Sequence, residues 1–96
     1  MADGQVTVRI PSPLRALTAG RSALSAHPGT LRAVIDELDG AHPGLKARIC
    51  EDDGTLRRFV NVFVNEEDIR FQHGLETKLK PGDEVSIIPA IAGGNS

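Results

Sequence analysis

Residues 58–65 read Arg-Phe-Val-Asn-Val-Phe-Val-Asn, and this stretch decides the fold. Valine alternates with other residues at a period of two, which is typical of a strand with one buried face. The valines predicted to face the core are Val60, Val62 and Val64. The opposite face then carries two of the three phenylalanines of the chain, Phe59 and Phe63, among asparagines. A one-sided apolar strand of this kind predicts a covering layer over its valine face.

The covering layer is predicted to be a helix that begins after the turn His27-Pro28-Gly29. Thr30 stands where a helix N-cap belongs, because its hydroxyl can accept a hydrogen bond from a free backbone N–H. Apolar residues follow at i, i+3, i+4 and i+7, the spacing of one helical face. They are Leu31, Val34, Ile35 and Leu38. Gly40 is expected to end this helix in a left-handed turn.

Three further segments are predicted as strands. Residues 5–10 alternate apolar and polar side chains, and residues 22–26 are expected to return beside them as a hairpin. Residues 84–88 form the last strand, with Val85 and Ile87 facing inward. Between these strands, residues 45–50 are expected to form a short helix.

Residues 66–80 are expected to be a longer connection that apolar side chains anchor to the core. The expected anchors are Ile69, Phe71, Leu75 and Leu79. Together these elements predict an α+β roll, in which one main helix covers one face of a sheet of about four to five strands. Phe59, Phe63 and Ile88 would lie on the uncovered face, and such an apolar cluster suggests a docking surface.

The composition excludes several classes of function. The chain has 96 residues and a net charge of −2, which indicates a single domain and argues against nonspecific binding to nucleic acid. No stretch reaches the roughly 18 apolar residues that a membrane-spanning helix needs. Residues 1–10 lack the pattern of a signal peptide, and one cysteine cannot form an intramolecular disulfide. The cytoplasm is therefore the expected compartment.

No catalytic or metal-binding pattern stands out in the sequence. Cys50 has an acidic neighbour, Glu51, and no adjacent His or Lys that would lower the pKa of its thiol. A half-buried structural cysteine is favoured over a nucleophile or sulfur acceptor. The histidines are scattered without metal-ligand spacing, and no glycine motif for binding phosphate is present.

The end of the chain, Pro-Ala-Ile-Ala-Gly-Gly-Asn-Ser at residues 89–96, is the strongest functional signal. A glycine pair alone is weak evidence, because most chain ends are simply frayed. This pair, however, follows a predicted strand directly, and each extended residue adds roughly 3.3 to 3.6 Å of reach. Glycine has no side chain, so Ala92, Gly93 and Gly94 could thread a narrow channel and bring a main-chain carboxylate to another enzyme.

With these features the sequence resembles the ubiquitin-like sulfur carriers of bacteria, the β-grasp proteins of molybdopterin, thiamin and cysteine biosynthesis. The residues that carry the resemblance are 58–71, Gly74-Leu75 and 89–94, and the likeness extends from Val6 to Gly94. The nearest likeness is to the actinobacterial carrier that serves a dedicated cysteine synthase. The resemblance implies a β-grasp domain over residues 1–91 and a C-terminal tail over residues 92–96.

The resemblance also implies a mechanism in which this chain catalyses nothing itself. An E1-like enzyme would adenylate the carboxylate of Gly94 with ATP, and a sulfur donor would then leave a thiocarboxylate there. The sulfur would pass to an acceptor held on pyridoxal phosphate by a partner synthase, and a peptidase would later release cysteine. No cofactor is expected on this chain, since ATP and pyridoxal phosphate belong to the partners. Phe59, Phe63 and Ile88 would dock the activating enzyme.

Two residues depart from the family pattern, in which the active form ends at the second glycine. Asn95 and Ser96 follow Gly94 here and would hold its carboxylate in a peptide bond. In one interpretation they are part of a precursor, which a peptidase such as a metallopeptidase cuts between Gly94 and Asn95. In the other, they are foreign to the natural chain. The precursor is favoured.

Two other functions remain open from the sequence. The chain could be a ubiquitin-like modifier joined to lysines through Gly94, or a non-covalent β-grasp adaptor whose tail is inert. Within the sulfur carriers, cysteine formation is favoured, and thiamin, molybdopterin or a secondary metabolite are alternatives. Family likeness supports the choice of acceptor only by association.

Overall fold

The computed structural model describes residues 4–89, so the predicted boundary between residues 91 and 92 lies outside the described residues. The strands are β1 (Val6–Arg9), β2 (Ala23–Ala26), β3 (Gly29–Thr30), β4 (Val60–Val64), β5 (Glu67–Asp68), β6 (Lys78–Leu79) and β7 (Glu84–Pro89). The helices are α1 (Leu31–Ala41) and α2 (Leu45–Ile49). Residues 4–89 also contain three short 3-10 helices: η1 (Ser12–Thr18), η2 (Ile69–Phe71) and η3 (Gly74–Glu76).

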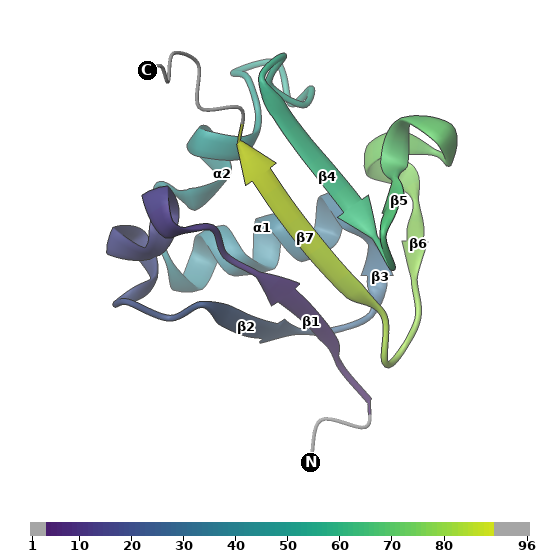
Figure 1. The fold of residues 1–96 in the computed structure, drawn as a ribbon, viewed down its shortest axis with the longest axis horizontal. Coiled ribbons are helices and arrows are strands. Elements are labelled where there is room, and N and C mark those ends of the chain that lie inside the picture. Colours follow the sequence, from purple (N-terminus) through teal and green to yellow (C-terminus); the bar gives the residue numbers. More distant parts are fainter. Residues whose placement is uncertain (1–3, 90–96) are drawn as a thin grey trace.

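Five strands form one mixed sheet in the order β2-β1-β7-β4-β5, and β3 pairs with β6 separately. The last strand, β7, lies in the middle of this sheet (Figure 1). It runs parallel to β1 and antiparallel to β4, so hydrogen bonds hold it from both sides. The chain therefore enters residues 90–96 from one of the most firmly held strands of the molecule.

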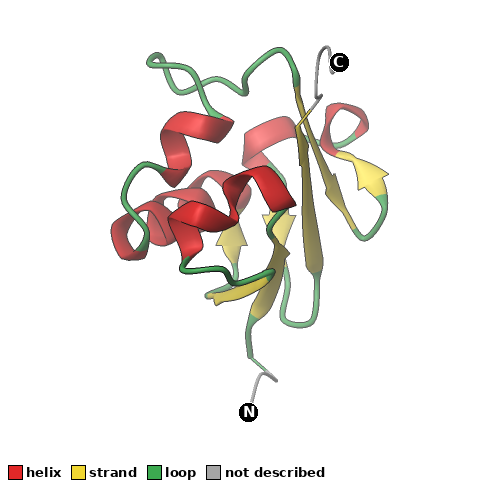
Figure 2. Ribbon diagram, turned by 60° about the vertical axis from the view of Figure 1, so that its left-hand side comes forward, coloured by secondary structure: helices red, strands yellow, loops and turns green. Residues whose placement is uncertain are grey.

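The core lies between the sheet and helix α1, as the alternating valines of residues 58–65 predict. Val60, Val62 and Val64 are all buried, with Val62 only 1% exposed. The apolar face of α1 is buried as well, through Leu31, Val34, Ile35 and Leu38. Figures 1 and 2 show α1 and α2 together on one side of the sheet. The predicted α+β roll with one covered face is confirmed.

Helix α1 begins as the sequence predicts. The Oγ1 of Thr30 accepts a hydrogen bond from the backbone N–H of Ala33 at 3.2 Å, which satisfies one of the free donors at the helix start. The predicted hairpin is also present, since β1 and β2 pair antiparallel with Val6 opposite Ala26. The connection between these strands contains η1, which the sequence analysis did not predict.

The prediction that Gly40 ends α1 is wrong, because the helix runs through Gly40 to Ala41. The left-handed position falls instead at Gly44, with φ 98°. The Asp39 carboxylate explains this shift: it accepts the backbone N–H of Gly44 at 3.1 Å and that of Lys46 at 3.0 Å. These bonds hold the start of α2 against the end of α1, so the turn forms four residues later than expected.

Strand β4 is shorter than the predicted strand of residues 58–65. It begins at Val60, and Arg58 and Phe59 lie in the turn before it. The backbone N–H of Val60 donates to the carbonyl of Arg57 at 3.1 Å, which closes that turn. Phe59 therefore precedes the sheet and does not belong to its regular face.

Residues 66–80 are more structured than a single connection. Asn65 and Glu66 have positive φ values of 51° and 72°, and they join β4 to β5 as a two-residue hairpin loop. The prediction that Phe71 anchors this segment is wrong, because Phe71 is 81% exposed, whereas Ile69 is 1% exposed. Both residues lie in η2, where three residues make one turn, so they cannot both point inward.

Candidate functional site

The predicted tail residues Ala92, Gly93 and Gly94, and the predicted cleavage point before Asn95, lie outside the described residues. The part of the site that the structure describes is the surface from which that tail continues. It comprises the carboxyl end of β7, the open face of the sheet beside it, and the turn that precedes β4.

Strand β7 ends at Pro89, which pairs with Val60 at the start of β4. A hollow of about 440 Å³ opens there, between the end of β7 and the turn before β4. It is lined by Glu51, Arg57, Arg58, Phe59, Val60 and Pro89. Pro89, the last described residue, thus lies beside two arginines and an exposed phenylalanine.

The open face of the sheet brings two of the three predicted docking residues together. Phe63 lies opposite Ser86, and Ile88 lies two residues further along the same strand, so Phe63 and Ile88 are diagonal neighbours on one face. Ile88 is 50% exposed and Phe63 is half-buried. Both are apolar positions on the face that the helices leave uncovered.

The third predicted docking residue, Phe59, belongs to the turn before β4 and not to this open face. Its side chain is 60% exposed and lines the same hollow as Pro89. The guanidinium carbon of Arg58 lies 5.9 Å from the centre of the Phe59 ring, within the range of a cation–π interaction. Phe59 therefore lies near the end of β7, next to a positive charge.

Polar groups flank the apolar residues of the open face. An ion pair between Arg9 and Glu84 lies beside them on β1 and β7. Arg70 donates to the Oδ1 of Asn61 at 2.7 Å and to the carbonyl of Val60 at 3.4 Å, which covers part of the outer edge of β4. An apolar centre with a polar rim is the usual anatomy of a protein interface.

Cys50 is buried, with 4% of its surface exposed, which is deeper than the half-buried position expected from the sequence. Burial raises the pKa of its thiol, although Lys46 and Arg32 act in the opposite direction. A thiol that is covered and protonated at neutral pH is a poor nucleophile. Within residues 4–89 no cluster of three His, Cys, Asp or Glu side chains could hold a metal ion.

The arginines around the turn before β4 were not predicted as site residues from the sequence. Arg58 and Arg70 lie in or beside the candidate site, and each is followed by an exposed phenylalanine, Phe59 or Phe71. The repeated Arg-Phe pair was the available signal, because arginine and aromatic side chains are enriched at interfaces. The pattern of apolar residues alone assigned Phe71 to the core.

The mixed sheet, the helix across one face and the central last strand define the class of protein: a ubiquitin-like β-grasp protein. The model of the ThiS family matches residues 8–94, which is most of the chain. The chain belongs to the ThiS family of sulfur carriers, and the resemblance inferred from its sequence is thereby confirmed.

Three relatives place the chain within this group. It is 47% identical over 91 residues to the sulfur carrier protein CysO of Mycobacterium tuberculosis, covering 93% of this chain and 98% of that protein. A chain in the crystal structure of the Amycolatopsis orientalis BexX/CysO complex superposes with a TM-score of 0.87 at 46% identity, covering 93% and 99% of the two chains. Small archaeal modifier protein 1 of Methanosarcina acetivorans superposes with a TM-score of 0.80 at 33% identity, covering 95% and 97%.

Among the helices of residues 4–89, none has the length and apolar character required to cross a membrane.

Proposed function

We propose that this chain is a sulfur carrier that bears a thiocarboxylate on the main-chain carboxyl group of Gly94. In the first step, a carboxylate oxygen of Gly94 attacks the α-phosphorus of ATP on an E1-like enzyme and releases pyrophosphate. In the second step, a sulfide-level donor attacks the acyl carbon, and AMP leaves with the oxygen. The sulfur then passes to an acceptor on a partner synthase, and the pyridoxal phosphate of a cysteine-forming synthase belongs to that partner.

The observation that carries this proposal is the 47% identity with a sulfur carrier protein over 93% of the chain. The fold supports it, because the diglycine segment follows a strand that is held on both sides. The buried thiol of Cys50 supports it indirectly, since a covered and protonated thiol offers a poor alternative site for carrying sulfur. Delivery of cysteine as the final product is the favoured outcome. An ATP-dependent partner makes the cytoplasm the expected compartment.

The activating enzyme is proposed to dock on the open face through Phe63 and Ile88, with Phe59 as a third contact near the tail. Phe63 and Ile88 are neighbours on that face, and Ile88 and Phe59 are half or more exposed. Burial of such apolar surface would supply binding energy, while the ion pair of Arg9 and Glu84 would lie at the rim.

Asn95 and Ser96 are proposed to mask the reactive carboxylate until a peptidase removes them. An amide at Gly94 has no carboxylate oxygen to attack ATP, so the full-length chain should remain uncharged. A chain that ends at Gly94 should accept sulfur.

The experiment is a measurement of intact mass after incubation with an E1-like enzyme, ATP and sulfide. The chain ending at Gly94 should gain the mass that results from exchanging one oxygen for sulfur, and the full-length chain should not. A chain ending at Gly93 is the control for the position of the carboxylate. Charging of the full-length chain at the same rate would contradict the masking step, and no charging of the shortened chain would reject the carrier function.

A second function is a ubiquitin-like modifier, which the likeness to a small archaeal modifier protein favours. Both functions share the activation of Gly94 and differ in the acceptor, which would be a lysine amine on a target protein. Target lysines carrying a Gly-Gly remnant after proteolysis would support the modifier. If deletion of residues 93–96 causes no loss of function, the chain acts as a non-covalent adaptor.

A further inference from the structure

A groove of about 660 Å³ lies between the turn before β4, the segment η2–η3 and the first turn of α1. Half of the eight arginines of the chain line it, in a protein whose net charge is −2. These arginines are Arg32, Arg57, Arg58 and Arg70. Glu76 is the one acidic side chain among the described residues that line the groove. This concentration of positive charge is local and opposite in sign to the whole chain.

The acidic side chains nearby leave part of this positive charge unpaired. Arg32 forms an ion pair with Glu76 at 2.7 Å. Arg57 and Arg70 form longer ion pairs, with Glu51 at 3.6 Å and with Asp68 at 3.8 Å. Within residues 4–89, Arg58 makes neither an ion pair nor a side-chain hydrogen bond with a carboxylate. Its exposed guanidinium is therefore available to an acidic group from outside the chain.

The walls of the groove have the composition of a surface that binds protein. Ile69, Leu75 and Leu56 provide apolar side chains between the guanidinium groups. Exposed phenylalanines stand next to Arg58 and Arg70 in the chain, and they are 60% and 81% exposed. Arginine and aromatic side chains dominate the binding energy of many protein interfaces.

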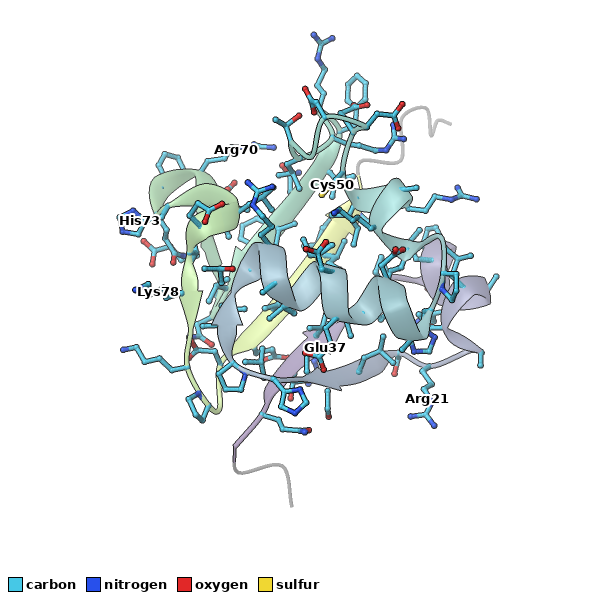
Figure 3. The ribbon with its side chains drawn as sticks, turned by 180° about the vertical axis from the view of Figure 1, so that it is seen from behind. Arg21, Glu37, Cys50, Arg70, His73 and Lys78 are labelled. Carbon is cyan, nitrogen blue, oxygen red and sulfur yellow. The ribbon has the colours of Figure 1, made fainter. Side chains whose placement is uncertain are left out.

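The groove is continuous with the place where the tail departs. Arg57 and Arg58 line both this groove and the hollow that contains Pro89. A protein that docks at the end of β7, beside Pro89, would also extend over these arginines. Figure 3 shows Arg70 and His73 on this side of the molecule, with Arg21 at the far side.

We propose that this groove binds an acidic segment of the enzyme that receives the tail, through its Asp or Glu side chains. The inference rests on the proposed function and adds to it a second contact, separate from the open sheet face. A protein segment is favoured over a small anion because Arg32, Arg57 and Arg70 keep 43–51% of their side-chain surface exposed in an open groove. Charge complementarity at this position would accelerate encounter and orient the tail toward the active site.

The test compares Arg58→Glu with Arg21→Glu in chains that end at Gly94, using the E1-like enzyme as the partner. Both substitutions change the net charge equally, and both side chains are exposed. Thermal unfolding of each variant checks that the fold is unchanged. The rate of thiocarboxylate formation is then measured by intact mass over a range of carrier concentrations, at low and at high ionic strength.

Arg58→Glu should lower kcat/KM by roughly tenfold at low ionic strength, mainly through a higher KM. The difference from the parent chain should shrink as salt screens the charges. Arg21→Glu should charge like the parent chain. Arg70→Glu should lower kcat/KM in the same way as Arg58→Glu. A loss in both variants would show that the whole groove contributes to binding, and not Arg58 alone.

Equal kcat/KM values for Arg58→Glu and Arg21→Glu would overturn the proposal while leaving the carrier function intact. A loss in Arg58→Glu that does not depend on salt would also overturn it, since contact with an acidic segment must be screened. If the parent chain itself is not charged, both the carrier function and this surface are rejected. The three outcomes are distinct because each variant is measured beside the parent chain.

Discussion

At the scale of single residues, Asp83 links two turns that support the end of β4 and the start of β7. One of its carboxylate oxygens accepts a hydrogen bond from the Nδ2 of Asn65 at 3.0 Å, and the other accepts the backbone N–H of Lys80 at 2.8 Å. These bonds, the one from Lys80 first, lower the pKa of Asp83. Asn65 in turn accepts the backbone N–H of Glu84 at 3.0 Å, so the carboxylate helps to hold the start of β7.

This arrangement predicts a pH dependence of stability. Because the pKa of Asp83 is lower in the folded chain than in the unfolded chain, its contribution is complete above the unfolded value and is lost as the pH falls through the folded value. Asp83→Asn should therefore cost about 1 kcal/mol at neutral pH and less below about pH 4. Urea unfolding at several pH values measures this. Asp52→Asn, in an exposed turn, is the control for net charge. If both variants lost the same unfolding free energy at every pH, the stabilising role of the Asp83 carboxylate would be contradicted.

At the scale of secondary-structure elements, the loop between β4 and β5 carries avoidable strain. Glu66 has a φ of 72°, in the left-handed region that side chains other than glycine, asparagine and aspartate rarely adopt. Asn65 tolerates its own positive φ because a short polar side chain is suited to it. The hairpin nevertheless forms here, because the adjoining strand pairs Val64 with Glu67.

Glu66→Gly should therefore stabilise the chain by up to about 1 kcal/mol, because glycine adopts this φ without steric cost. The gain is measured as a higher urea midpoint with an unchanged slope. Glu67→Gly is the matched control: it places glycine in β5, where backbone entropy should make it destabilising. A loss of stability in Glu66→Gly would show that the Glu66 side chain has a stabilising contact that outweighs the strain.

At the scale of the whole molecule, the order of the strands connects the open face to the tail. Ile88 lies one residue before the end of β7, with half of its surface exposed, so the same strand supplies a docking side chain and the start of the tail. A protein that binds the open face therefore also contacts the strand from which residues 90–96 continue.

Ile88→Ser should raise the KM for charging by an E1-like enzyme roughly tenfold, which corresponds to a loss of about 1.4 kcal/mol at an apolar anchor. The stability of the variant should change little, because the side chain is already half exposed. Ile88→Val keeps an apolar surface and should charge nearly normally. A normal KM for Ile88→Ser would mean that the activating enzyme docks elsewhere on the carrier.

The patterns in the sequence determined the faces of the elements. The alternating valines of residues 60–64 and the spacing of Leu31 to Leu38 were sufficient to predict one sheet face covered by one helix, and both are confirmed. They were sufficient because burial of a strand or helix face imposes a period that is visible within a few residues. The diglycine at Gly93 and Gly94 could also be recognised from local sequence, because it closely follows a segment with the pattern of a strand.

Only the tertiary structure decided which distant residues become neighbours. It placed β7 between β1 and β4, gathered Arg32, Arg58 and Arg70 in one groove, and turned Phe71 toward solvent. None of these follows from a local period, because strand pairing and the direction of a 3-10 turn depend on long-range hydrogen bonds and packing. Charges far apart in the chain can therefore form one surface that only the folded molecule reveals.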